Sequence, residues 1–302
     1  MKRISAFVSV PVISFALIAC SGSNSPGGAN DNGNDSSSIE VNQDVVSAEN
    51  VFVYVPSPIE TAGLLKEAGA KYNKDFLNLP QNASKYSTTA SLALNLGVYG
   101  ADLAFAGIFD QHAETMVYLD CTGKLADGLH VSTAFSTDRK NRLEANMNNR
   151  DSVLSIITDS YWDCDALLHE NKEEYASSLM VAGGWVEGLY LACKVAEQTN
   201  SNDIRVRIVE QRYSLDKLLV LLGREKNEDV KSVTGQLREL KVLFDALPKN
   251  PDQPTVVSTD DKSGMTTLGT DPAPPPVSLN ALEFKNILER VTVIRDSIIT
   301  RN

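Results

Sequence analysis

Two carboxylates lie within segments of the sequence that are otherwise apolar. Asp102 is the sole acidic residue between positions 86 and 109, and Glu187 is the sole charged residue between positions 175 and 193. A buried carboxylate must be paired, hydrogen-bonded or protonated, because an isolated ion in an apolar interior costs several kcal/mol. The two side chains are therefore candidates for a polar binding site or for an internal network.

The neighbours of both carboxylates repeat at helical spacing. Asn95 and Tyr99 precede Asp102 by seven and three residues, and Gly184 and Tyr190 lie three residues on either side of Glu187. Residues three, four and seven apart share one face of a helix. Glycine beside a carboxylate and an aromatic ring leaves room for a ligand or for another backbone. The candidate polar pocket consists of Asn95, Tyr99, Asp102, Gly183, Gly184, Trp185, Glu187 and Tyr190.

The alternative is an internal polar network that fixes the register of the helices. An arginine such as Arg142 or Arg150 would complete it by balancing the carboxylates. We favour this network over the pocket. A further alternative is an enzyme of unfamiliar type that uses Asp102 and Glu187 as acid and base.

A second acidic cluster has the spacing of a weak metal site. Asp159 and Asp163 are four residues apart and could share a divalent cation. Calcium sites usually need loop carbonyls as well, so a solvated helix face is the interpretation that we favour. The sequence shows no recognised catalytic motif, and its histidines, His112, His130 and His169, lack the spacing of metal ligands. We therefore predict no metal or cofactor, and a non-enzymatic protein is favoured.

Hydrophobic periodicity predicts an all-α domain, an irregular bundle of about eight or nine helices. Ser57-Pro58-Ile59-Glu60 has the pattern of a helix start with a capping box. The helices containing Asp102 and Glu187 are apolar on nearly every face, so we expect both at the centre. Outside the helical segments, the sequence predicts a small β-hairpin near 255–268, where two runs of β-branched residues flank a turn that contains Gly264. Helices are expected at 57–72, 86–109, 111–129, 136–147, 151–170, 175–198, 204–222, 227–246 and 279–300.

The N-terminus has the pattern of a secretory signal. Lys2 and Arg3 precede an apolar stretch from Ile4 to Ala19, which is too short for a comfortable membrane span. Leu17-Ile18-Ala19-Cys20 resembles the lipobox of bacterial lipoprotein precursors. The resemblance implies cleavage before Cys20, acylation of its thiol, and anchoring to a lipid bilayer.

The rest of the N-terminal region favours a flexible tether. Residues 21–38 consist mainly of Gly, Ser, Asn and Asp, without a large apolar side chain. The predicted organisation is a signal peptide at 1–19, lipidated Cys20 with a tether at 20–44, and one helical domain at 45–302. Ser21 differs from the aspartate that retains some lipoproteins in the inner membrane, so we expect the outer membrane, with its periplasmic or external face left open.

The net charge limits the possible binding partners, and the number of cysteines limits the possible disulfides. The formal charge of −11 becomes −13 when Lys2 and Arg3 are removed, which does not suit a nucleic-acid partner. Once Cys20 is lipidated, three cysteines remain, and an odd number cannot form a complete disulfide framework. Although one disulfide is an alternative, we favour three buried thiols, at Cys121, Cys164 and Cys193.

Three stretches carry a resemblance to a known family. Pro56-Ser57-Pro58, residues 93–106 and residues 179–192 resemble a family of helical lipoproteins of Bacteroidota-type bacteria to which no activity is assigned. The resemblance covers roughly residues 50–300 and implies location and fold, without a mechanism. The expected function is a membrane-anchored, non-enzymatic binding or scaffolding module of the cell envelope, with an unknown envelope protein as partner. The alternative is a lipoprotein that binds a small molecule for a transport system.

Overall fold

The computed structural model describes residues 57–248, 255–259, 266–270 and 277–301. The described helices belong to one compact unit. The signal peptide, the lipidated cysteine and the tether lie outside the described residues and stay predictions from the sequence.

The described residues form a helical bundle, which confirms the all-α prediction. The nine α-helices of this part of the chain are α2 (Pro58–Glu67), α3 (Thr89–Ile108), α4 (His112–Gly128), α5 (Thr137–Ala145), α6 (Arg150–Glu170), α7 (Glu174–Thr199), α8 (Asn202–Leu222), α9 (Glu228–Asp245) and α10 (Ala281–Ile299). Short 3-10 helices lie at η1 (Lys74–Phe76), η2 (Pro80–Ser84) and η3 (Ser132–Phe135). The first helix ends earlier than expected, because Gly69 adopts a φ of +85°.

Capping at Ser57 explains where α2 begins. The Ser57 hydroxyl accepts from the Glu60 amide at 3.2 Å, and the Glu60 carboxylate accepts from the Ser57 amide at 2.7 Å. Pro58 occupies the first turn, where its missing N–H costs nothing. The predicted capping box is therefore present.

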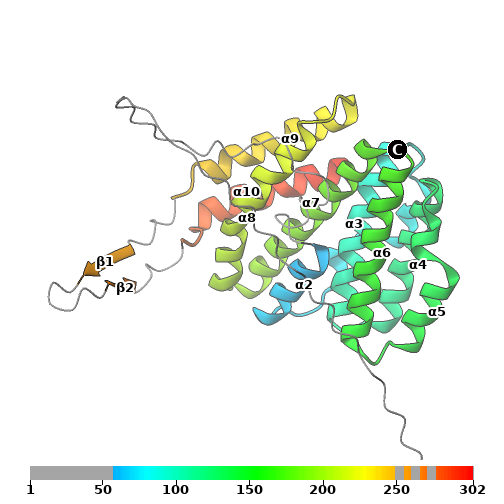
Figure 1. Ribbon diagram of the computed structural model, residues 1–302, viewed down its shortest axis with the longest axis horizontal. Coiled ribbons are helices and arrows are strands. Elements are labelled where there is room, and N and C mark those ends of the chain that lie inside the picture. The colour runs from blue at the N-terminus through cyan, green and yellow to red at the C-terminus, as the bar shows by residue number, and fades with distance from the viewer. Residues whose placement is uncertain (1–56, 249–254, 260–265, 271–276, 302) are drawn as a thin grey trace, which may run out of the picture. The chain divides into compact units, whose positions relative to one another are not determined.

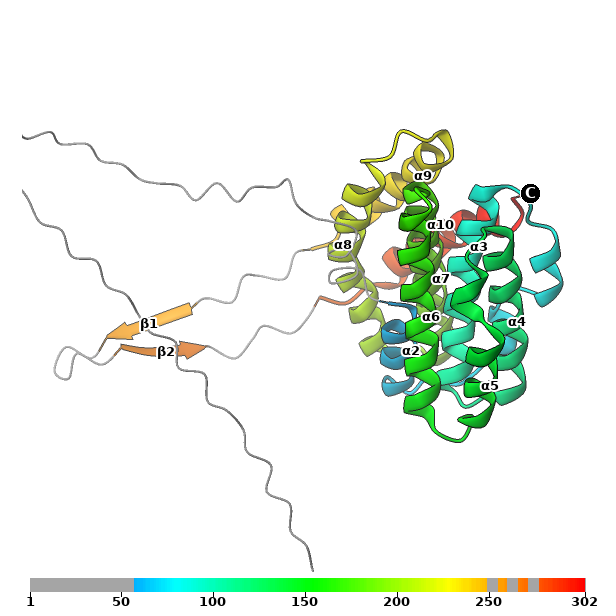
Figure 2. The ribbon, with the colours of Figure 1, turned by 45° about the vertical axis from the view of Figure 1, so that its right-hand side comes forward.

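Helices α3 and α7 form the centre of the bundle. They pack mainly against each other, while α2, α4 and α6 cover α3, and α8 and α10 cover α7. Helices α4 and α5 lie on one side of the bundle and α8 and α9 on the other (Figure 1; Figure 2). In α3, 19 of the 20 residues are buried, and in α7, 19 of the 26 are, as the sequence predicted for two apolar helices.

The same two helices are long and apolar enough to cross a membrane. Within this fold, however, 100% of the apolar window of α3 and 94% of that of α7 are buried against other parts of the protein. Their composition is therefore accounted for by their place in the core.

Between α9 and α10 the chain has two short extended segments. Strands β1 (Thr255–Thr259) and β2 (Thr266–Thr270) pair antiparallel, with Thr255 opposite Thr270 and Thr259 opposite Thr266. The residues that would join them lie outside the described part of the chain, so a hairpin near 255–268 stays a prediction.

Candidate functional site

Asp102 and Glu187 lie in a buried charged cluster that is completed by Arg295. Asp102 projects from α3, Glu187 from α7 and Arg295 from α10. Arg295 donates from Nε to Glu187 Oε2 at 2.7 Å and from Nη2 to Glu187 Oε1 at 2.9 Å. This two-point geometry is the strongest that a guanidinium and a carboxylate adopt. One cation thus balances one of the two buried carboxylates directly.

The surroundings of the second carboxyl, Asp102, favour its neutral form. Burial raises the pKa of Asp102 well above its usual range, the nearby Glu187 charge and a hydrogen bond to that carboxylate raise it further, and Arg295 and the Asn78 amide oppose the rise. Asp102 Oδ1 has no hydrogen-bond partner among the described residues, whereas Oδ2 accepts from the Asn78 amide. The cluster is then one ion pair with a second carboxyl beside it, whose surroundings favour the protonated form.

The cluster holds the irregular segment between α2 and α3. Arg295 Nη2 donates to the Phe76 carbonyl at 3.1 Å, and the Asn78 amide donates to Asp102 Oδ2 at 3.0 Å. Phe76 and Asn78 are both buried, yet they lie outside any α-helix. Buried backbone groups without helical partners need other partners. The charged side chains supply them.

Two tyrosines also hold the segment between α2 and α3 by hydrogen bonds to its backbone. Tyr118 donates its hydroxyl to the Asn78 carbonyl at 3.0 Å, and Tyr99 donates to the Leu79 carbonyl at 2.7 Å. Burial raises the pKa of both tyrosines, so each keeps the proton that it donates. The chain from Phe76 to Leu79 is therefore fixed by side chains of α3, α4 and α10.

Asn95 lies on the same face of α3 as Asp102, one turn or more nearer the start of the helix, and it also binds backbone carbonyls. Its Nδ2 donates to the Ser91 carbonyl at 2.9 Å and to the Ile298 carbonyl at 3.1 Å. It thereby joins α3 to the last turn of α10. The spacing of Asn95, Tyr99 and Asp102 correctly predicted that they share a face, and this face contacts the protein's own backbone.

The two glycines of the predicted pocket serve the packing of α3 against α7. A Cβ on Gly183 would lie 2.0 Å from the Leu94 carbonyl oxygen, and one on Gly184 would lie 3.1 Å from the Tyr161 hydroxyl. Another backbone and a tyrosine thus fill the space that glycine leaves. Of the two uses that the sequence allowed for these glycines, the structure shows the close approach of a backbone.

The two aromatic residues that α7 contributes to the predicted pocket, Trp185 and Tyr190, have different partners. Trp185 donates its indole N–H to Ser214 Oγ at 2.9 Å. Tyr190 packs its ring 4.2 Å from the guanidinium carbon of Arg295, a cation–π contact. Tyr190 therefore belongs to the charged cluster, whereas Trp185 faces α8.

The prediction that Arg142 or Arg150 completes the network is wrong. Arg150 pairs with the exposed Asp110 at 3.3 Å, and Arg142 lies on α5, which packs against α6 and η3. Arg295 takes this role because α10 packs against α7 and α3. The sequence held a signal for it, since Arg295 lies four residues after Val291 and three before Ile298 on the apolar face of α10.

The weak metal candidates lie apart from any ligand cluster. Asp163 forms an ion pair with Arg139 at 2.6 Å, and Asp159 is exposed on α6. In the part of the chain that the structure describes, no three potential ligands come together. Asp163 and Asp159 therefore have the character of a solvated helix face.

The cysteines of the domain are buried thiols. Cys121, Cys164 and Cys193 are free, and burial raises the pKa of Cys121 to about 11. A thiol with a raised pKa holds little reactive thiolate at neutral pH. None of the three residues therefore has the character of an activated nucleophile.

Comparison with known proteins adds no relative. Protein-family models, curated proteins and solved structures gave no match to the chain. The resemblance to helical lipoproteins therefore stays a prediction.

Proposed function

We propose that the protein is a lipoprotein of the cell envelope whose helical domain acts as a non-enzymatic binding or scaffolding module. The signal-like N-terminus and Cys20 support the anchor, with the outer membrane as its expected location. We also propose that the chain is related to the helical lipoproteins of the resemblance and that residues 255–268 form a β-hairpin.

The observation that carries the non-enzymatic interpretation is the direction of the buried hydrogen bonds. Arg295 and Asp102 bind the backbone of Phe76 and Asn78, and both Asp102 and Glu187 are fully buried. A general acid and base must reach a substrate atom directly or through one water. Side chains enclosed in this way favour support of a loop over catalysis.

The supported loop borders a surface groove of about 590 Å³. Leu79, Pro80 and Gln81 form one wall, and Val117 and Glu114 of α4 form part of the other. Leu79 is 64% exposed and Val117 is 43% exposed. Loops that a rigid scaffold positions commonly carry binding residues. We take this groove as the binding surface of the module.

The groove fits an extended protein segment with apolar side chains and a basic flank. Leu79 and Val117 offer apolar contact, while Asp75 and Glu114 outnumber Lys74 among its charged lining residues. A large negative charge on the whole chain attracts a basic partner as well. The partner is therefore proposed to be a protein of the envelope with an apolar, positively flanked segment.

Native mass spectrometry of the protein extracted gently from its host's membranes tests this function. The wild-type chain should carry a stoichiometric protein partner, and Leu79→Ser with Val117→Ser should lose it. Val242→Ser is the matched control, because Val242 is 67% exposed on α9, outside the groove. A partner that survives in the groove variant would disprove the groove, and a co-purified small molecule would favour the transport alternative.

A further inference from the structure

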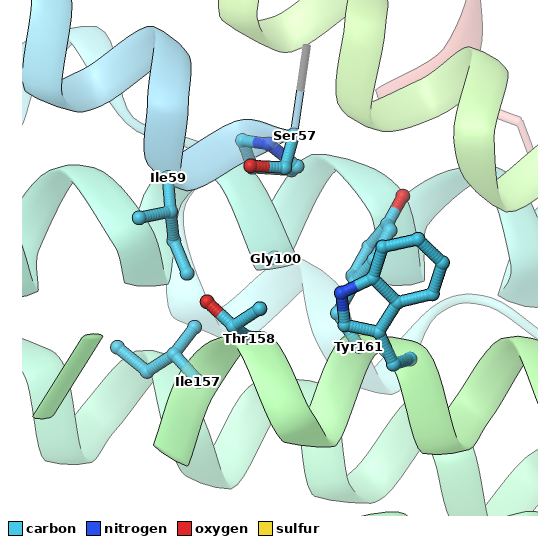
Figure 3. A pocket seen from close by; sticks show the side chains of 8 residues that line it. Ser57, Ile59, Gly100, Ile157, Thr158 and Tyr161 are labelled. Carbon is cyan, nitrogen blue, oxygen red and sulfur yellow. The ribbon is translucent and has the colours of Figure 1, made fainter. Parts of the chain in front are cut away.

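The size of a hollow limits what it can bind. In Figure 3, Ile59 of α2 faces Ile157 of α6, with Gly100 of α3 behind them. The volume between these side chains is about 20 Å³, which has room for about one water molecule. The groove beside η1 and η2, at about 590 Å³, is large enough for the side chains of a peptide segment. Of these two hollows, only the groove can therefore seat side chains of another protein.

Glu114 is a carboxylate that lines this groove without a cation of its own. It lies in the first turn of α4 and is half-buried. Among the described residues no lysine or arginine pairs with it, whereas Asp120 on the same helix pairs with Lys140 at 2.6 Å. Attraction between opposite charges is stronger where water is partly excluded. Glu114 is therefore placed to bind a cation that a partner brings.

Val117 places an apolar side chain next to this carboxylate. It follows Glu114 by three residues, so both lie on one face of α4, with their Cβ atoms about 5–6 Å apart. Leu79 supplies a second apolar side chain from the other wall of the groove. The Tyr99 hydroxyl donates to the Leu79 carbonyl at 2.7 Å, so this wall is fixed before a partner arrives. The groove thus presents one carboxylate beside two apolar side chains.

The distance between Glu114 and Val117 determines which partner residues can contact both. In an extended chain, neighbouring side chains point to opposite sides, and residues two apart lie about 6.6 Å apart on the same side. That distance matches the Cβ separation of about 5–6 Å on α4. Two adjacent residues of an extended chain cannot both face the groove.

We propose that Glu114 determines the specificity of the groove by binding a lysine or arginine of the partner. This basic residue lies two residues from the apolar side chain that contacts Val117 and Leu79. The inference rests on the proposed function, because it names the partner segment of the same groove. Asp75 strengthens the preference for a positive charge, and Lys74 opposes it.

Three synthetic peptides labelled with rhodamine test this specificity, by fluorescence anisotropy with the full chain in a non-ionic detergent. The first peptide reads Ser-Arg-Ser-Leu-Ser-Ile-Ser, with arginine two residues before leucine. The second has glutamate in place of arginine. The third reads Ser-Ser-Arg-Leu-Ser-Ile-Ser, in which arginine and leucine are adjacent.

The first peptide should bind about ten-fold tighter than the second, because an ion pair with Glu114 replaces a like-charge contact. It should bind about three-fold tighter than the third, in which arginine points away from Glu114. Equal affinities of the wild-type chain for the first and second peptides, or for the first and third, overturn the proposal.

Glu114→Gln should reduce the advantage of the first peptide over the second to about three-fold or less. Asp127→Asn is the matched control, because Asp127 is exposed on α4 outside the groove and its variant loses the same charge. This control should keep the wild-type preference. Thermal unfolding followed by circular dichroism establishes that both variants are folded, since a negative charge in the first turn also stabilises a helix.

A ten-fold preference that survives in the folded Glu114→Gln variant, or that is lost equally in Asp127→Asn, also overturns the proposal. The proposed function is tested separately, by loss of the natural partner when Leu79 and Val117 are replaced by serine. That loss can be observed while the peptide preference fails, so the two failures are distinguishable.

Discussion

Arg295 binds Glu187 through two nitrogens, at 2.7 and 2.9 Å, and so joins α10 to α7 inside the core. The same guanidinium reaches the Phe76 carbonyl, and Asp102 beside it binds the Asn78 amide. One charged group thereby couples two helices and the segment that leads into a third. Its removal should affect the whole bundle.

Arg295→Met should lower the free energy of unfolding at pH 7 by about 3–5 kcal/mol, because it leaves a buried carboxylate without its cation. Lys285→Met on the same helix is the control. Both side chains of its pair with Glu289 are exposed, and loss of such a pair costs about 0–1 kcal/mol. Urea unfolding measures both variants. Equal losses of unfolding free energy in the two variants would show that the buried pair stabilises the fold no more than an exposed pair does.

Asp102→Asn should change how stability depends on pH. The raised pKa of Asp102 means that the folded chain keeps a proton that the unfolded chain releases above about pH 4. This stabilisation is fully present below that pH and is lost as pH rises toward and through the folded pKa, by up to about 1.4 kcal/mol per pH unit. Asparagine stays neutral and keeps an acceptor for the Asn78 amide.

Relative to wild type, Asp102→Asn should therefore gain stability as pH increases from about 4 to about 8, measured by urea unfolding at several pH values. Asp110→Asn serves as the control. Burial opposes the shift, but hydrogen bonds from Arg150 and Lys66 lower the pKa of Asp110 overall, so this side chain is ionised in both states above about pH 5. Above that pH, the stability of Asp110→Asn should change with pH in the same way as that of wild type. Parallel curves for Asp102→Asn would show that the carboxyl is ionised in the fold.

Gly97→Ala should unfold the domain or lower its melting temperature strongly. A Cβ at this position would lie 2.0 Å from the Met180 carbonyl oxygen, so α3 and α7 would have to separate. A cost above about 3 kcal/mol is expected for overpacking of this severity. Gly235→Ala on α9 meets nothing within 4 Å and should stabilise by about 0.4–1 kcal/mol. Similar melting temperatures for the two variants would contradict the close crossing.

Cys20→Ser should abolish the membrane anchor. Metabolic labelling with radioactive palmitate should mark the wild-type chain and leave the variant unlabelled, because the thiol is the acylation site. The variant should also remain uncleaved or appear in the soluble fraction. Ser21→Ala, one residue further, should label normally. Label retained by Cys20→Ser would disprove the predicted lipobox.

The sequence by itself was sufficient for the class of the fold and for the position of its helices. Apolar periodicity and capping residues such as Ser57 act within one or two turns, so they can be recognised without knowledge of distant contacts. The apolar composition around Asp102 and Glu187 likewise predicted burial, and each carboxylate is fully buried.

Only the tertiary structure decided what those carboxylates contact. Arg295 is 108 residues from Glu187, and Asn78 is 24 residues from Asp102. Spacing along one helix shows which residues share a face but not which other element covers that face. For the same reason Gly183 and Gly184 could be seen to leave space, while the backbone of Leu94 that fills part of it became visible only once α3 and α7 were packed together.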